Sequence, residues 1–238
     1  MEIMTETRMR ENVLSIKERI ATAAARSGRA PRDVMLVGVS KFQPLDSLYM
    51  ALDCGITVFG ENRAQERESK AASWTRESAV WHMIGHLQRN KAKRAAELFD
   101  CIESVDSLQL ASTLDRIMAE TRLKVAPYPV MIEVNTSGEE SKYGVEPSRF
   151  LELVEEISRD CRRLAIDGLM TIGPLEGGER GARESFALLR SLAAEAREKL
   201  GLPMRHLSMG MSGDFEIAIE EGSTLVRIGT GIFGARHG

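Results

Sequence analysis

The pattern of apolar positions predicts a buried strand near the start of the chain. Residues 34–39, Val-Met-Leu-Val-Gly-Val, carry no polar side chain and show no alternation of apolar and polar positions. A short unbroken apolar run is typical of a strand covered on both faces, as in a parallel sheet. The run ends in Ser40 and Lys41, and Pro44 suits the first turn of a following helix. Lys41 is therefore expected at the carboxyl end of a buried strand, where α/β proteins commonly place their chemistry.

Apolar runs and amphipathic stretches alternate along the rest of the chain. A leading helix is predicted over residues 5–27, where Val13, Ile16 and Ile20 share one face and Gly28 provides a stop. Further strands are predicted at residues 57–60, 80–84, 101–105, 130–134, 164–171, 206–209 and 224–228. Helices are predicted at residues 45–54, 61–73, 88–99, 107–121, 147–159, 180–200 and 214–221.

This order of elements predicts the fold class. Strands that alternate with helices are typical of parallel sheets with right-handed crossovers. Eight such units after a leading helix predict a (β/α)8 TIM barrel with an extra N-terminal helix, and a doubly wound open sheet is the alternative. No linker, low-complexity segment or repeat divides the chain, so residues 1–238 are expected to form a single barrel domain.

Composition narrows the class of protein. Hydrophobic residues at 43% and charged residues at 28% are ordinary for a soluble globular protein. The net charge of −3 gives no indication of binding to nucleic acid or to an anionic membrane. The three cysteines, Cys54, Cys101 and Cys161, lie far apart and favour free thiols in a reducing compartment over disulfides or zinc. Without a signal-peptide pattern or a membrane-spanning apolar run, a cytoplasmic location is expected.

Two loops rich in glycine and hydroxyl residues follow the predicted seventh and eighth strands. They are residues 209–214, Met-Gly-Met-Ser-Gly-Asp, and residues 229–234, Gly-Thr-Gly-Ile-Phe-Gly. Barrels frequently bind phosphate with these two loops, since glycine lets backbone N–H groups approach an anion and a helix start adds its dipole. Ordinary turns and helix caps would explain one such loop, but two in the expected places favour a phosphate. Residues 229–234 also match a dinucleotide fingerprint, which we reject because that motif opens the first βαβ unit.

Lys41, the two loops and Arg227 in the last predicted strand are expected to meet at one barrel mouth. A phosphorylated aldehyde cofactor requires a lysine amine for a Schiff base, an anion-binding loop and a partner for its ring nitrogen. Pyridoxal 5′-phosphate (PLP) is the cofactor that this set favours. Arginine does not release its proton, so Arg227 would keep the pyridine largely unprotonated. An aldolase-like Schiff-base enzyme acting on a phosphosugar would use the same lysine and loops and remains an alternative.

Several longer segments carry a family resemblance. They are residues 37–41 (Val-Gly-Val-Ser-Lys), 59–62 (Phe-Gly-Glu-Asn), 81–91 (Trp-His-Met-Ile-Gly-His-Leu-Gln-Arg-Asn-Lys), 168–172 (Gly-Leu-Met-Thr-Ile), 207–215 (Leu-Ser-Met-Gly-Met-Ser-Gly-Asp-Phe) and 226–236 (Val-Arg-Ile-Gly-Thr-Gly-Ile-Phe-Gly-Ala-Arg). In this order they resemble the YggS-type PLP homeostasis family, which has the alanine racemase N-terminal-domain fold. The resemblance covers nearly the whole chain. Phe42 departs from it, since many members have threonine there, and this affects only a local contact.

The resemblance implies a site and a function. It implies a PLP protein of fold type III without the C-terminal β domain, acting in intracellular PLP (vitamin B6) homeostasis. By resemblance, Lys41 carries PLP as a Schiff base, Ser212, Gly229 and Thr230 hold its phosphate, Arg227 meets the pyridine nitrogen and Asn62 lies beside the cofactor. PLP-dependent apoenzymes would be the recipients of the cofactor.

A PLP-dependent amino-acid racemase is the alternative function. Related enzymes supply a second base, a tyrosine, across a dimer interface from a C-terminal β domain, whereas this sequence ends directly after the last predicted strand. Tyr49 is expected in the helix after Lys41, and Tyr128 is expected to precede a strand on the far side of the barrel. Tyr143, in a mouth-side loop, remains a candidate base. Without this second base and the covering domain, racemization would lack general acid–base catalysis on one face of the substrate. We therefore predict a carrier without catalytic turnover. We also predict a monomer, because in the related enzymes the covering C-terminal domain supplies the dimer contacts.

Three further polar residues are candidates for a functional role. His82 is expected either to face the cofactor or to be a hydrogen-bonded core histidine. His86 lies four residues later, but Gly85 and a strand intervene instead of a helix, so no metal site is expected. Lys142 is expected to be a solvated loop lysine, with contact to the cofactor rim or to a second PLP as the alternative.

Overall fold

The computed structural model describes residues 4–121 and 127–234. Eight parallel strands form a closed barrel in which each strand pairs with the next along the chain and the last pairs with the first. The strands are β1 (Met35–Val39), β2 (Val58–Glu61), β3 (Val80–Met83), β4 (Cys101–Val105), β5 (Tyr128–Glu133), β6 (Leu164–Met170), β7 (His206–Ser208) and β8 (Leu225–Ile228). The predicted (β/α)8 barrel is confirmed.

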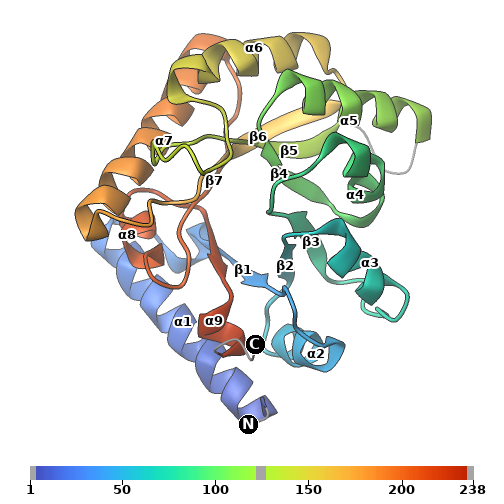
Figure 1. Ribbon diagram of the computed structural model, residues 1–238. Helices are drawn as coiled ribbons and strands as arrows, with labels where there is room; N and C mark the ends of the chain where they lie inside the picture. Colours follow the sequence, from blue (N-terminus) through green and yellow to red (C-terminus); the bar gives the residue numbers. More distant parts are fainter. Residues whose placement is uncertain (1–3, 122–126, 235–238) are drawn as a thin grey trace.

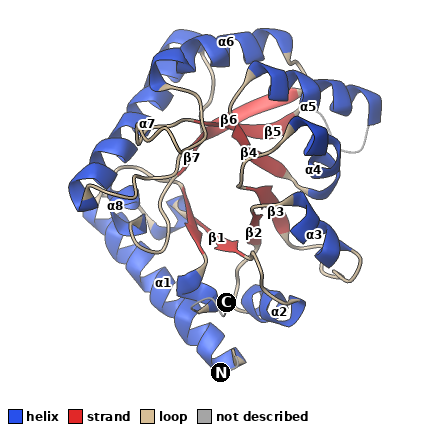
Figure 2. Ribbon diagram, in the orientation of Figure 1, coloured by secondary structure: helices blue, strands red, loops and turns tan. Residues whose placement is uncertain are grey.

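Helices surround the strands on the outside of the barrel, as Figures 1 and 2 show. They are α1 (Glu6–Arg26), α2 (Leu45–Asp53), α3 (Ala64–Ala71), α4 (Ala92–Leu98), α5 (Leu108–Thr121), α6 (Phe150–Asp160), α7 (Gly178–Leu200), α8 (Phe215–Glu220) and α9 (Thr230–Phe233), with short 3-10 turns at Pro31–Asp33, Arg89–Lys91 and Pro147–Arg149. Within the described part of the chain, no helix combines the length and the apolarity that crossing a membrane requires.

The leading helix α1 packs against the outside of the barrel beside α8 and α9. Thr5 caps its start, accepting a hydrogen bond from the backbone N–H of Arg8 at 3.2 Å. The predicted apolar face is buried, and Val13, Ile16 and Ile20 are each at most 4% exposed. The helix therefore covers the side of the barrel next to α8 and α9.

Three expectations for the elements need correction. The helix predicted from residue 61 begins at Ala64, and Glu61 is instead the last residue of β2 and fully buried. Residues 230–233, expected to form a loop, make one helical turn. Tyr128, expected before a strand, is the first residue of β5. The polar side chain of Glu61 concealed the strand end, because hydrophobic periodicity counts a buried charged residue as surface.

The barrel interior has an apolar layer and a polar layer. Buried apolar side chains from six strands form one interior cluster: Val37, Val58, Cys101, Met131, Met170 and Leu225. Side chains two residues apart on a strand point to the same face, so the next interior positions follow from this set. These positions, nearer the carboxyl ends of the strands, carry buried Glu103, Glu133 and Arg227. A charged layer thus lies beneath the barrel mouth.

Candidate functional site

A cavity of about 230 Å³ opens at the carboxyl ends of β1 and β8. Its lining comprises Val39, Lys41, Gln43, Met211, Ser212, Gly213, Arg227, Gly229, Thr230 and Gly234. Strand pairing explains this grouping, because Val37 lies opposite Arg227 and the two strands end side by side. Five of the six residues proposed from the sequence, all except Asn62, therefore line one cavity.

A tight turn presents Lys41 at the rim of this cavity. The backbone N–H of Gln43 donates to the carbonyl of Ser40 at 3.1 Å, which closes a β-turn over residues 40–43. Phe42 in this turn has φ +62°, a left-handed conformation that costs a residue with a side chain about 1–2 kcal/mol. Phe42 as a whole is 69% exposed. The chain therefore reverses directly after β1 and carries Lys41 to the mouth.

Arg227 is held rigidly inside the barrel. One terminal nitrogen of its guanidinium donates to the hydroxyl of Ser208 at 2.6 Å, and the other donates to the carbonyl of Thr171 at 2.7 Å. Burial lowers the pKa of Arg227, and nearby carboxylates, Glu103 foremost, act in the opposite direction. An arginine remains protonated under such a shift, so Arg227 offers a fixed positive charge to the cavity.

A chain of hydrogen bonds continues from Arg227 across the barrel. The Ser208 hydroxyl donates to Glu103 at 2.5 Å, and the other carboxylate oxygen of Glu103 lies 2.5 Å from Nδ1 of His82. Burial acts to raise the pKa of Glu103, but the hydrogen bond and charge of His82, together with Arg227 and Ser208, lower it below its usual value. His82 is thus a hydrogen-bonded core histidine that stabilises a buried carboxylate.

Glu133 is a second interior carboxyl that the sequence did not single out. It is 3% exposed, and its Oε2 has no hydrogen-bond partner within the described residues. Burial, followed by the charge of Asp106, raises the pKa of Glu133 to about 7, although Arg227 acts in the opposite direction. The signal that could have located Glu133 is strand alternation, because it lies two positions after buried Met131.

The two glycine-rich loops offer hydrogen-bond donors to the cavity. Among the described residues, the hydroxyls of Ser212 and Thr230 have no hydrogen-bond partner, and the backbone N–H groups of Ser212 and Gly213 find no backbone acceptor. Asp214 is used within its own loop, where it accepts a hydrogen bond from the N–H of Met211 at 2.6 Å. The loops thus combine internal support with unused donors, the chemistry that an anion requires.

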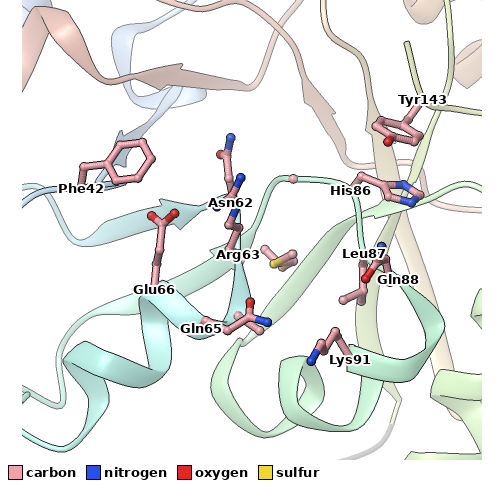
Figure 3. A pocket seen from close by; sticks show the side chains of 13 residues that line it. Phe42, Asn62, Arg63, Gln65, Glu66, His86, Leu87, Gln88, Lys91 and Tyr143 are labelled. Carbon is pink, nitrogen blue, oxygen red and sulfur yellow. The ribbon is translucent and has the colours of Figure 1, made fainter. Parts of the chain in front are cut away.

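Asn62 lines a neighbouring cavity of about 740 Å³, and not the smaller cavity that the other five proposed site residues line. Figure 3 shows Asn62 between Phe42 on one side and the rings of His86 and Tyr143 on the other. The two rings stack 3.7 Å apart at 10°. Phe42 lines this cavity while both its chain neighbours line the smaller one, so the two cavities adjoin along the turn.

The remaining polar candidates have structural partners. Lys142 is not a solvated loop lysine: its side chain is 12% exposed, donates to the carbonyl of Gly173 at 2.5 Å and pairs with Glu139 at 3.0 Å. The hydroxyl of Tyr49 donates to the Ser73 carbonyl, and that of Tyr128 donates to the Phe99 carbonyl. Across residues 4–121 and 127–234, no cluster of histidine, cysteine and carboxylate side chains has the composition of a metal site.

Comparison with known proteins decides the family. Residues 10–237 match the family described as alanine racemase, N-terminal domain. The chain is 39% identical over 226 residues to the pyridoxal phosphate homeostasis protein of Aquifex aeolicus, covering 95% of this chain and 97% of that protein. It is 42% identical over 239 residues to the human protein of the same name, covering 93% and 84% respectively. The chain belongs to the pyridoxal phosphate homeostasis family.

Solved structures agree with this family. PipY of Synechococcus elongatus, in a structure with PLP bound, has a TM-score of 0.80 and 38% identity, covering 92% of this chain and 100% of that one. An alanine racemase of Clostridium difficile has a TM-score of 0.70 at 12% identity, and the match spans 57% of that chain. At this identity the racemase shares the fold alone. The predicted barrel of the alanine racemase N-terminal domain is confirmed.

Proposed function

We propose that this protein binds PLP at Lys41 and serves in PLP homeostasis without catalytic turnover of its own. The observation that carries the proposal is the single cavity that combines Lys41, Arg227 and the unused hydroxyls of Ser212 and Thr230. The name of the relatives and the PLP held by PipY support it. The alternative phosphosugar aldolase has no counterpart among these relatives.

The residues of the cavity fit PLP in chemical type. When bound, PLP supplies an aldehyde that condenses with primary amines and a conjugated ring that accepts electron density. The amine of Lys41 would hold the aldehyde carbon, and Ser212, Gly229 and Thr230 would hold the phosphate through hydroxyl and backbone donors. Arg227, pinned by Ser208 and Thr171, would face the ring nitrogen with a charge that is not lost. Asn62 would lie beside the cofactor, on the side of the larger cavity.

The proposal of a carrier rests on the available proton donors. Racemization needs a second acid–base group on the opposite face of the substrate. The hydroxyls of Tyr49 and Tyr128 are already engaged with backbone carbonyls. This absence of an available second base on Tyr49 or Tyr128 supports a carrier.

We further infer a cytoplasmic monomer that delivers PLP to PLP-dependent apoenzymes. The three cysteines are all free thiols, which supports the reducing compartment that a cytoplasmic location provides.

A racemase is the second candidate, and one residue favours it. Tyr143 lines the larger cavity beside Asn62, is 57% exposed, and stacks on His86. It is the remaining tyrosine of the chain and the only one on a loop at the barrel mouth within the described residues. If Tyr143 were the base of a racemase, Tyr143→Phe would abolish racemization in samples saturated with PLP.

The test is the visible absorption of purified protein with added PLP, followed by borohydride reduction and peptide mapping. We expect a visible band and a covalent PLP label on Lys41, both lost in Lys41→Ala. Lys93→Ala, which removes an exposed lysine of α4, is the matched control and should retain both. Racemase assays on the same sample, with Tyr143→Phe alongside, should show no turnover. A protein that takes up no PLP would contradict the proposed function, and turnover that requires Tyr143 would replace the carrier with a racemase.

A further inference from the structure

A buried charged cluster lies directly behind Lys41. Ser40, the residue before Lys41, and Glu61, the last residue of β2, are both fully buried, and Lys70 of α3 is 8% exposed. The ammonium of Lys70 donates to the backbone carbonyl of Ser40 at 2.7 Å and forms an ion pair with Oε1 of Glu61. The Ser40 hydroxyl donates to the same carboxylate oxygen at 2.8 Å. A buried ion pair therefore holds the peptide unit that joins Ser40 to Lys41.

The backbone of Ser40 is held from two further directions, through both of the peptide units that flank it. The N–H of Ser40 donates to the carbonyl of Gly60 at 3.0 Å, and its carbonyl accepts from Gln43 at 3.1 Å as well as from Lys70. Hydrogen bonds to a charged group are roughly twice as strong as neutral ones, and more so away from water. The charge of Lys70 thus fixes the direction in which the chain leaves β1, and with it the start of the Lys41 side chain.

Glu61 carries one unpaired oxygen in this cluster. Its Oε2 is buried without a hydrogen-bond partner in the described part of the chain, whereas its Oε1 meets both Lys70 and Ser40. Burial raises the pKa of Glu61, although the charge and hydrogen bond of Lys70 and the hydrogen bond of Ser40 act in the opposite direction. The ion pair with Lys70 therefore offsets part of the cost of burying this carboxyl group.

Two further charged residues of α3 lie near the ion pair. Glu66 extends from α3 on the side of Phe42, at the edge of the larger cavity (Figure 3). Arg67 on the same helix lies over the ring of Trp81 at 4.1 Å, and its charge reaches Glu61 and Asp100.

We propose that the buried ion pair of Glu61 and Lys70 forms a clamp on Ser40 that positions Lys41 for reaction with the aldehyde of PLP, an inference that rests on the proposed function of Lys41. Neither residue lines the cavity that contains Lys41, so both are positioning residues. Buried ion pairs stabilise a fold poorly compared with apolar residues of similar size. A role in placing the neighbouring lysine accounts for this cluster better than stability does.

The test compares variants by how fast and how selectively PLP labels Lys41. Lys70→Met and Glu61→Gln each remove one half of the ion pair, and the double variant removes both without leaving an unpaired charge. Glu66→Gln keeps the shape of a nearby carboxyl side chain that is not part of the ion pair, and serves as a first control. Glu68→Gln changes an exposed carboxylate of the same helix, ion-paired with Arg94, and is the matched control. Limiting PLP, borohydride trapping and peptide mapping give the rate and the fraction of label on each lysine, and circular dichroism reports folding.

We expect the Lys70→Met, Glu61→Gln and double variants to load Lys41 about tenfold more slowly or worse, since a misplacement of about 1 Å can cost 10²-fold. Their label should shift to surface lysines while the fold is retained, and Lys70→Arg should recover part of the rate. Glu66→Gln should remain within about twofold of the wild type, as should Glu68→Gln. Selectivity among lysines distinguishes positioning from a general loss of stability.

Two results would count against the proposals, each in a distinct way. A folded double variant that loads Lys41 at the wild-type rate and selectivity would exclude the clamp. A wild-type protein without label on Lys41 would instead contradict the proposed function, because the clamp variants are compared only with a wild type that is labelled.

Discussion

At the scale of single residues, Glu133 gives the most direct pH dependence. Burial raises its pKa to about 7 from an ordinary value of 4.5. Because the folded-state pKa is the higher one, the stabilising contribution is fully present below about pH 4.5 and is lost as the pH rises through about 7. The difference between these two pKa values corresponds to a change of about 3 kcal/mol in the free energy of unfolding from low to high pH.

Glu133→Gln should therefore flatten this part of the pH profile. The amide keeps the size of the side chain and cannot ionise. The free energy of unfolding of the variant, relative to that of the wild type, should therefore be higher at pH 8 than at pH 5. Urea unfolding of both proteins at the two pH values measures this difference. Glu152→Gln, which changes an exposed carboxylate on α6, serves as the control and should run parallel to the wild type. An unchanged difference between wild type and Glu133→Gln at the two pH values would contradict the assigned titration.

Residue type and position together determined which site residues the sequence could predict. Lys41, Arg227 and the loop residues Ser212, Gly229 and Thr230 stand at strand ends or inside glycine-rich loops, where barrel geometry alone brings them together. Glu61 and Glu133 were not found in this way, because hydrophobic periodicity counts a buried charge as surface, although strand alternation places Glu133 two positions after buried Met131. Lys142 was misjudged for the same reason, since its partners Glu139 and Gly173 come from two different loops.

At the scale of elements, the loops after β2 and β3 meet at a single glycine. A Cβ atom at Gly85 would lie 2.4 Å from the backbone oxygen of Asn62 and 2.8 Å from its Cα. Backbone atoms cannot yield as a flexible side chain can, so only glycine allows this approach. Gly85 thereby sets the position of Asn62 at the edge of the larger cavity.

Gly85→Ala should therefore destabilise the protein by about 1–3 kcal/mol, the usual cost of overpacking. A Cβ at Gly213 meets no atom within 4 Å, so Gly213→Ala should change the free energy of unfolding by less than about 0.5 kcal/mol. Thermal unfolding of the three proteins without PLP separates the two substitutions. Equal melting temperatures for Gly85→Ala and the wild type would show that the two loops can separate freely.

Element order was predictable, whereas several element ends were not. Every predicted strand has its counterpart in the barrel, because parallel buried strands leave unbroken apolar runs in the sequence. The end of β2 and the start of α3 were misplaced around Glu61, where a tertiary ion pair with Lys70 overrides local polarity. The turn of α9 was missed since the glycine-rich sequence of residues 229–234 has low helix propensity and its stability comes from packing.

At the scale of the whole molecule, the first helix supports the last one. Asn12 of α1 donates to the carbonyl of Ile232 in α9 at 2.9 Å. A Cβ at Gly231 would lie 3.1 Å from the end of the Ile16 side chain, so α1 and α9 approach closely there. Thr230, one of the proposed phosphate ligands, is the first residue of α9. Residues more than 200 positions apart therefore share the support of one half of the proposed phosphate site.

Ile16→Ala tests this support against a control on the same helix. Ile16 is 3% exposed, and its truncation should lower the free energy of unfolding by about 2–5 kcal/mol. Leu14 is 56% exposed, so Leu14→Ala should cost less than about 0.5 kcal/mol. Because the lost contact lies beneath α9, Ile16→Ala should also bind PLP more weakly well below its melting temperature, as measured by titration of the visible band. If its affinity for PLP equalled that of Leu14→Ala, α1 would stabilise the barrel without shaping the phosphate loop, and Thr230 would owe its position to β8 alone.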